Sequence, residues 1–404
     1  MEVTSSYIAD APVATRSRAK HPRWWLPLEI WAGVIVVAAL AQVFFKLGTY
    51  QWDLIVYWWG GHAFATGHSP YGAIPNQPVY LHYVYPPITA ALFAPLSLLN
   101  VAAAKLVWIT AKAAALWATV RMWQKATSSR DATIPPIFFF TFAFGSALLV
   151  DVTAGNIAVF EQFVLWLGFT ALLARKPWIF ALLVVVIAQF KLTPIFFLGV
   201  LLVIDERPRW APFVGGLTVF GALLASNFVA YPAQMHEFFT SISSLNERGW
   251  GDPATLGVMQ DLVDQVQSLG INIPSATAYV LYGAAALSVL YYTFRWWMRR
   301  RAESNVDRVL VVLISLVVYA LVMPRMKDYS YVALLPAAWY VLAKCRLNNA
   351  PIVVLATLVP RPLPQLNLRL PLLTQAYVYA PLFGALAVWC ELISESNQRE
   401  IATE

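Results

Sequence analysis

Asp53 is a carboxylate set among aromatic residues, in the segment Tyr50-Gln51-Trp52-Asp53-Leu54-Ile55-Val56-Tyr57, which comes shortly after the first apolar stretch of the chain. A carboxylate that is partly desolvated and within reach of a hydroxyl can take its proton as a general base. In the first turn of a surface helix, the same carboxylate would instead interact with the positive end of the helix dipole. The position of Asp53 alone leaves both interpretations open.

Three cations, Lys191, Arg325 and Lys327, stand outside the short basic loops that hold most of the Lys and Arg residues. A charge at membrane depth is costly and usually faces a cavity or a partner. Three converging cations could neutralise a phosphate group. Two other interpretations stay open. Lys191 can snorkel to an interface, and the other two cations can pair locally with Asp328.

An aromatic loop follows the acidic segment. His82, Tyr83 and Tyr85 lead into Pro86-Pro87. Aromatic faces with fixed polar groups suit a sugar, although aromatic residues at a membrane interface form a similar belt. The histidines of this region lack a metal-ligand spacing such as H-x-x-x-H, so we expect no metal ion.

Further acidic residues could support such a site. Glu161 lies inside an apolar segment, where it could be the buried partner of Lys191 or of another cation. Glu247, Arg248 and Asp252 could shape an acceptor cleft, and a solvated loop is the alternative interpretation.

The elements that must position these residues are membrane helices. The chain has 404 residues, of which 59% are hydrophobic and only 12% are charged, and its mean hydropathy is +0.61. Apolar stretches recur from Trp25 almost to the C-terminus, which predicts an all-α, polytopic helical bundle of about ten to twelve membrane segments. The net charge of +7 follows from basic residues in short loops, so we expect membrane lipids and no nucleic acid as partners.

The basic residues also predict an orientation. Cations before Trp25 place the N-terminus in the cytoplasm by the positive-inside rule. We therefore expect one membrane domain, with its site on the periplasmic or exterior face of a bacterial plasma membrane. Its divisions are a cytoplasmic tail (1–24), the membrane domain (25–393) with external segments 50–100 and 231–274 that include short amphipathic helices, and a second cytoplasmic tail (394–404).

The segment Pro177–Ile204 is unusual because both of its ends carry charges of the cytoplasmic kind. One span would put these ends on opposite sides, and two spans of about 14 residues would each be too short for a hydrocarbon core of about 30 Å. We expect a broken or re-entrant pair with Lys191 near its apex. Irregular backbone of this kind is tolerated only against protein or a wet cavity.

The order of these motifs resembles glycosyltransferase family 87, whose members are membrane enzymes of the C-type glycosyltransferase superfold. They include polyprenyl-phosphate-mannose-dependent α-1,2-mannosyltransferases. The resemblance covers most of the chain and rests on an ordered set rather than on one motif. The matching strings are Asp53–Tyr57, Gly67–Tyr71, Tyr85–Pro87 with Pro95-Leu96, the K-x-x-P string Lys191–Pro194, and the P-R-x-K-D-Y string Pro324–Tyr329.

This resemblance implies an inverting transfer from a polyprenyl-phosphate sugar donor, with mannose favoured, to a glycolipid or glycan acceptor. It implies that Asp53 is the general base, that three cations bind the donor phosphate, and that neither a metal nor another cofactor is needed. The expected phosphate-binding residues are Lys191, Arg325 and Lys327, and the expected substrate-binding residues are Tyr57, His82, Tyr85, Asn156 and Asp328.

The chain departs from the family pattern at two places. Many relatives carry G-Q-x-N where this chain has Thr153-Ala154-Gly155-Asn156, so the glutamine is absent or displaced to a position such as Gln162. Mannosyltransferase members also carry a histidine pair where this chain has Lys327-Asp328, which leaves arabinose, glucose and galactose open as donor sugars.

Two other classes of protein would use similar residues. A transporter of polyprenyl phosphate or glycolipid would bind a head group with the same cations and do no chemistry, although we find no internal repeat of the kind that transporters usually show. A non-catalytic scaffold of envelope synthesis would tolerate the loss of both Asp53 and Lys191.

Overall fold

The computed structural model describes residues 25–45, 50–72, 81–127, 135–243, 247–249, 251–302, 307–344, 356–359 and 376–401. Within these ranges the chain is helical, and none of the described residues forms a β-strand; Gly249 and Asp252 form one isolated bridge. The predicted all-α fold is therefore confirmed. The tail 1–24 lies outside the described residues.

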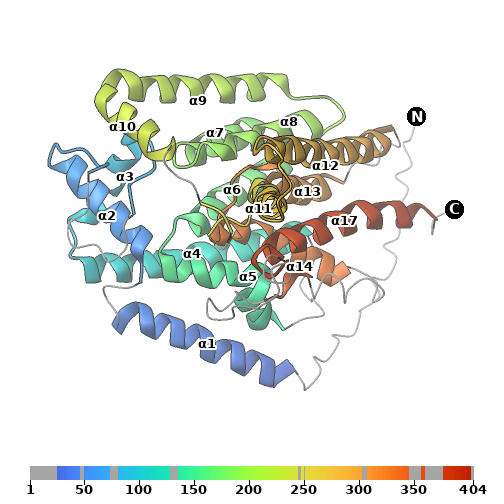
Figure 1. Ribbon diagram of the computed structural model, residues 1–404, viewed down its shortest axis with the longest axis horizontal. Helices are drawn as coiled ribbons and strands as arrows, with labels where there is room; N and C mark the ends of the chain where they lie inside the picture. Colours follow the sequence, from blue (N-terminus) through green and yellow to red (C-terminus); the bar gives the residue numbers. More distant parts are fainter. Residues whose placement is uncertain are drawn as a thin grey trace, which may run out of the picture.

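The helices build a bundle with α9 along one side and α1 along the other (Figure 1). Their bounds are α1 Trp25–Phe45, α2 Trp52–Ala65, α3 Pro87–Ser97, α4 Val101–Thr127, α5 Pro136–Ala154, α6 Ala158–Leu173, α7 Pro177–Ala188, the 3₁₀ helix η1 Thr193–Gly199, α8 Val200–Val203, α9 Trp210–Ala230, α10 Pro232–Ser243, α11 Thr255–Ser268, α12 Thr277–Ala302, α13 Arg308–Val322, the 3₁₀ helix η2 Asp328–Leu334, α14 Leu335–Lys344 and α17 Ala380–Ile401.

The membrane character of the bundle follows from helix length and composition. Five helices are long and apolar enough to span a bilayer, namely α1, α4, α5, α9 and α12, and several shorter apolar helices accompany them. Most side chains of α1, α9 and α12 are not buried in the protein, which suits a surface that faces lipid. The protein is an integral membrane protein, as the sequence predicts.

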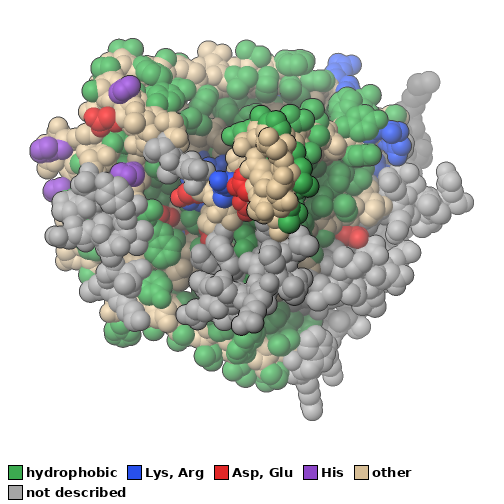
Figure 2. Space-filling view, viewed as in Figure 1, with side chains coloured by type: hydrophobic (Ala, Val, Ile, Leu, Met, Phe, Trp, Pro, Cys, Tyr) green, Lys and Arg blue, Asp and Glu red, His purple; other side chains and the backbone are tan. Residues whose placement is uncertain are grey.

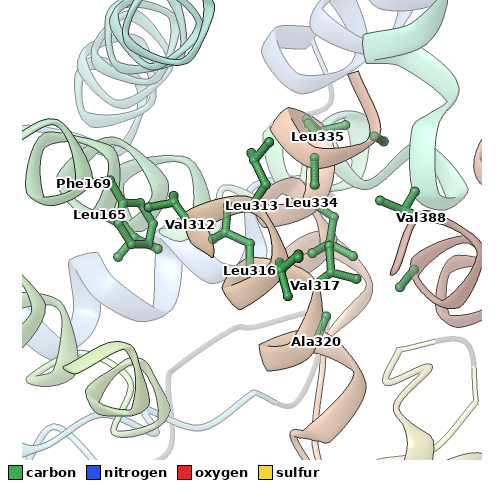
Figure 3. Packing of buried hydrophobic residues seen from close by; sticks show 14 of the residues in the cluster. Leu165, Phe169, Val312, Leu313, Leu316, Val317, Ala320, Leu334, Leu335 and Val388 are labelled. Carbon is green, nitrogen blue, oxygen red and sulfur yellow. The ribbon is translucent and has the colours of Figure 1, made fainter. Parts of the chain in front are cut away.

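The core is formed by helices that are buried on most sides. Residues of α6, α13, α14 and α17 interdigitate there, with Val312, Leu313, Leu316 and Val317 of α13 at the centre (Figure 3). Lipid tails are as apolar as these side chains, so close packing rather than the hydrophobic effect holds such helices together. This packed core is the rigid support against which the broken segments rest.

The segment Pro177–Ile204 is broken, as predicted. Helix α7 ends at Ala188, and η1 begins at Thr193, so Lys191 lies in the break between them. A second irregularity was not predicted: α5 is kinked at Ala143–Ser146, where three residues have left-handed backbone angles. One of them is Gly145, where an added Cβ would come within 3.1 Å of Pro381. Helix α17 is therefore packed against this kink.

Helices α2 and α3 pack at one end of the bundle, together with α10 (left in Figure 1); we refer to it as the Asp53 end. Their close approach depends on two glycines of α2. An added Cβ at Gly60 would lie 2.6 Å from the ring of Tyr83, and one at Gly61 would lie 2.5 Å from the backbone of Phe93. The short helices expected in the segments 50–100 and 231–274 include α2 and α11. Helix α11 is amphipathic as expected, whereas α2 has no distinct apolar face.

Helix α17 continues without a break to Ile401, so the expected tail is helical from residue 394 to residue 401. Between α14 and α17, the structure describes residues 356–359 and 376–379.

Candidate active site

Asp53 lies in the first turn of α2, where its carboxylate meets the turn between α5 and α6. The side-chain amide of Asn156 donates to Asp53 Oδ2 at 2.7 Å and to the hydroxyl of Tyr57 at 3.2 Å. Tyr57 stands one helical turn after Asp53, on the same face of α2, and its hydroxyl lies 2.9 Å from that of Tyr85. Four of the residues predicted from the sequence therefore form one hydrogen-bonded chain.

Gln51 fixes the start of α2 against the end of α5. Its backbone N–H donates to the Thr153 carbonyl at 2.8 Å, and its side-chain amide donates to the Val152 carbonyl. Gly155 is required opposite it, because its φ is +74° and an added Cβ would lie 2.7 Å from Gln51 Oε1. The glutamine that contacts this turn is thus Gln51, whereas Gln162 lies in α6.

A buried ion pair supports the same turn from below. Lys112 Nζ of α4 lies 2.6 Å from Asp151 Oδ2 and also donates to the Asp151 carbonyl at 2.7 Å. That carbonyl accepts the backbone N–H groups of Gly155 and Asn156, and the indole of Trp108 donates to the Gly155 carbonyl. The pair therefore holds the backbone that presents Asn156 to Asp53.

Sequence reasoning missed this pair, although a signal for it existed. Lys112 stands near the middle of an apolar segment, and an intramembrane lysine normally has a partner of opposite charge. Asp151 stands near the end of the next long apolar segment, where an acid is easily interpreted as an interfacial residue.

Lys191 is paired with Glu161, as one of the sequence alternatives proposed. Its ammonium lies 2.8 Å from Glu161 Oε2 and 5.4 Å from the ring centre of Tyr329. The break in the helix is also tied to α13, since the hydroxyls of Thr193 and Tyr319 lie 2.6 Å apart. The lysine side chain retains 22% of its exposure, so it is accessible in a way that Lys112 is not.

Arg325 and Lys327 both pair across the site with Glu247, in the segment between α10 and α11. Asp252 lies nearby, with one carboxylate oxygen 3.7 Å from Arg325 Nε and the other accepting from Met326 N at 2.6 Å. The solvated-loop interpretation is therefore wrong for Glu247 and Asp252. Arg248, by contrast, pairs with Asp264 on exposed surface.

The charges of this region act on one another. Burial raises the pKa of Asp53 to about 6, against the lowering effects of the hydrogen bond from Asn156 and of the charges of Lys327, Lys112 and Lys191. Burial acts on Glu247 in the same direction, but its hydrogen bonds and ion pairs with Lys327 and Arg325 hold its pKa below the ordinary value. Asp53 and the cations are thus close enough to influence one another.

Burial also raises the pKa of Tyr57 and of Tyr85 far above that of a free tyrosine, so both hydroxyls remain protonated near neutral pH. Figure 2 shows acidic and basic side chains meeting beside α11, on a face that otherwise carries mostly uncharged groups. His82 is half-buried in the loop before α3, and Asp328 is buried, with its carboxylate accepting from Tyr329 N.

An apolar groove of about 560 Å³ leads to this cluster between α3, α4, α6 and α7. Phe93, Trp108, Phe160 and Phe190 line it, and Glu161 is its acidic residue. A lipid tail lying in this groove would bring its head group toward Lys191. The arrangement can therefore combine a carboxylate of raised pKa, aromatic walls, nearby cations and access from the membrane.

Comparison with known proteins identifies the family of this chain. Residues 83–324 match glycosyltransferase family 87. The chain is also 27% identical over 344 residues to a polyprenol-phosphate-mannose-dependent α-(1-2)-phosphatidylinositol mannoside mannosyltransferase of Mycobacterium tuberculosis (strain ATCC 25618 / H37Rv), with 78% of this chain and 75% of the relative covered. The family match extends over more than half of the chain and spans the turn with Asn156, Lys191 and the first residue of the Pro324–Tyr329 string. The chain belongs to glycosyltransferase family 87.

Proposed function

We propose that this glycosyltransferase moves a sugar, with mannose favoured, from a polyprenyl-phosphate donor to a hydroxyl of a glycolipid or glycan acceptor. The observation that carries the proposal is the position of Asp53. A hydrogen bond from Asn156 orients its carboxylate, burial raises its pKa, and the phosphate-binding cations lie close enough to lower that pKa in part. The donor class is supported by the name of the mycobacterial relative.

In the proposed reaction, Asp53 takes the proton of the acceptor hydroxyl while the hydroxyl oxygen attacks the anomeric carbon of the donor sugar. The bond from that carbon to the phosphate oxygen breaks, and polyprenyl phosphate leaves with the bonding electrons. Attack opposite the leaving phosphate inverts the configuration. Preorganised cations that stabilise charge as it develops are usually the largest catalytic contribution, and we assign this role to Lys191, Arg325 and Lys327.

Each of the proposed phosphate-binding cations forms an ion pair with a glutamate, and these pairs have a consequence for donor binding. Lys191 pairs with Glu161, and Arg325 and Lys327 pair with Glu247. A donor phosphate would have to take over part of these pairs. After this exchange each cation still has an anionic partner. We also expect Asp53 to face the acceptor on the periplasmic or exterior side of the membrane.

The lipid-facing grooves offer places for the two lipid chains. We assign the polyprenyl tail to the groove between α3, α4, α6 and α7, because Glu161, the partner of Lys191, lines this groove. A second apolar cavity of about 300 Å³ between η1, α12 and α13 includes Tyr319, and it could take an acyl chain of a lipid acceptor.

Asp53→Asn tests the proposed role directly. Purified protein is supplied with a radiolabelled polyprenyl-phosphate mannose and a membrane glycolipid extract, and both the labelled product and free polyprenyl phosphate are measured. We expect transfer to fall by a factor of about 10² to 10⁴, with thermal stability unchanged. The matched control is Asp264→Asn, which removes an exposed carboxylate of α11 and should leave transfer unchanged. Retained transfer by Asp53→Asn would remove Asp53 from the mechanism, and an intact donor with the wild-type protein would favour a carrier without chemistry.

A further inference from the structure

A second charged cavity lies at the opposite end of the bundle from Asp53. Helix α6 begins at Ala158, next to Asn156, and ends at Leu173, so at about 1.5 Å per residue it separates its ends by about 24 Å. At its far end, the α6–α7 turn, the α8–α9 turn and the start of α13 meet. They enclose a cavity of about 560 Å³ whose charged lining is Arg175, Asp205, Glu206, Arg207, Arg209 and Arg308.

Asp205 organises one wall of this cavity. Its two carboxylate oxygens lie 2.5 Å from Arg209 Nε and 3.3 Å from Arg308 Nε. Arg308 also donates to the carbonyls at the end of α6, at 3.0 Å and 2.8 Å. These contacts join the end of α6, the α8–α9 turn and the start of α13. Asp205 is neutralised by Arg209 and Arg308, so these two arginines stabilise the walls of the cavity.

Two other arginines have no such partner. Among the described residues, no carboxylate lies within ion-pair distance of Arg175 or Arg207, and both side chains are exposed. The cavity has four arginines against one aspartate and one glutamate, so its lining keeps an excess of positive charge. It is therefore built to attract an anion.

The backbone at Arg175 is unusual for an arginine. Its φ is +60°, a left-handed value that normally favours glycine or asparagine at the end of a helix. Residues held in sparsely populated backbone conformations often belong to ligand-binding sites. Here a glycine would end α6 with less strain, but it would leave the cavity without this guanidinium.

Exposed tryptophans place the cavity at the boundary of the membrane. Trp178 and Trp210 stand in the first turns of α7 and α9, and they are 57% and 59% exposed. Tryptophan favours the membrane–water interface. Further along the same helices, Leu182 and Val214 are exposed apolar residues, which suit contact with acyl chains. The helices are in close contact here, because an added Cβ at Gly215 would lie 2.6 Å from the Trp178 ring.

We propose that this cavity binds the phosphate of an anionic phospholipid. The acyl chains would follow the exposed face of α7 and α9, and the phosphate would be bound by Arg175 and Arg207. Arginine matches phosphate oxygens with paired hydrogen bonds, and basic pockets between membrane helices bind anionic head groups in this way. The proposal does not depend on the transfer reaction. Basic side chains also gather near the C-terminal end of α12, at the right of Figure 2, away from the Asp53 end.

The test is a titration of the purified full-length protein in a mild detergent, with bound ligand counted by native mass spectrometry. Phosphatidylglycerol, phosphatidylcholine and inorganic phosphate are titrated in parallel. The test variant is Arg175→Gln/Arg207→Gln. The matched control is Lys125→Gln/Lys176→Gln, which removes the same charge from exposed residues that do not line the cavity.

We expect phosphatidylglycerol to bind the wild-type protein more tightly than the other two ligands. The test variant should bind it about 30-fold more weakly, since each basic residue contributes roughly one kcal/mol to an anionic surface interaction, and the control variant should bind it normally. Equal weakening in both variants, or equal binding of inorganic phosphate, would overturn the proposal. Should the double variant fail to fold, Arg207→Gln alone is expected to weaken binding about fivefold, and unchanged binding would overturn it.

Discussion

The Lys112–Asp151 pair and the Lys191–Glu161 pair lie in different surroundings. The Lys112–Asp151 pair is sealed, with side-chain exposures of 3% and 0%, and its lysine also binds a backbone carbonyl. The Lys191–Glu161 pair lies in a helix break beside an apolar groove, with exposures of 22% and 9%. The first pair is almost completely enclosed by protein, whereas the second is partly exposed, as an exchange of its carboxylate for a donor phosphate would require.

The difference teaches that an intramembrane charge is not functional in one way only. A sealed pair fixes the backbone, here the turn that carries Asn156 toward Asp53. Under the proposed function, the accessible pair keeps Lys191 neutralised until the donor phosphate binds. Removing one member of the sealed pair should therefore lower stability, whereas removing the lysine of the accessible pair should change the kinetics.

The largest effect is expected from the sealed pair. Asp151→Asn leaves Lys112 buried without a counter-charge, and breaking a buried pair in this way destabilises a protein by about 3–5 kcal/mol. We expect a large fall in the thermal denaturation temperature in detergent, with loss of activity following loss of folded protein. The control is Lys112→Met/Asp151→Leu, which removes both charges and should recover much of the stability. A stable Asp151→Asn protein would contradict the structural role.

The accessible pair should respond in kinetics. Lys191→Met removes a proposed phosphate-binding cation, so we expect kcat/KM for the donor to fall by a factor of about 10² to 10³. Glu161→Gln instead leaves Lys191 without its glutamate, and we expect activity to be retained with an unchanged or lower KM for the donor. Folding is checked by thermal denaturation of both variants. Equal loss of activity in the two would show that the pair itself, rather than the lysine, is needed.

Much of this comparison could be predicted from the sequence, and the rest could not for physical reasons. Lys191 was identifiable because its flanking segments are too short to span, and α7 and η1 do break there. Glu161 could be assigned to Lys191 or to another cation, because threading does not fix which helix faces lie opposite each other. The reach of Arg325 and Lys327 to Glu247 depends on tertiary contacts 78 and more positions apart in sequence, which local patterns do not contain.

The same limit applies to the support of Asp53. A short helix near Asp53 could be predicted, but the left-handed Gln51 and the kink in α5 depend on neighbours distant in sequence. Asn156 could be proposed only from the family pattern. Its hydrogen bond to Asp53 joins residues 103 positions apart.

An intermediate effect is expected from Gly155→Ala, which disturbs the turn without touching either ion pair. The added Cβ would lie 2.7 Å from Gln51 Oε1 and 3.0 Å from Leu54 Cβ, so α2 and its Asp53 must shift. Misplacement of a catalytic group by about 1 Å can lower the rate up to about 10²-fold. Gly67→Ala is the matched control, because Gly67 has the same left-handed φ but no atom within 4 Å of an added Cβ. We expect it to keep its kcat, and equal losses in both variants would point to backbone strain alone.

The smallest effect is expected in the pH profile. With the pKa of Asp53 near 6, kcat/KM should be constant above that pH and fall about tenfold per unit below it, because only the ionised carboxylate accepts a proton. The charge of Lys191 lowers the pKa of Asp53. Glu161→Gln removes the negative charge that neutralises Lys191, so the pKa of Asp53 should fall further and the acid limb should move to lower pH. The doubly neutralised Lys112→Met/Asp151→Leu removes opposite charges together, and its limb should move less. The measurement is kcat/KM over about pH 4.5–8. An acid limb at the same pH in Glu161→Gln and in the wild-type protein would show that the Lys191–Glu161 pair does not affect the pKa of Asp53.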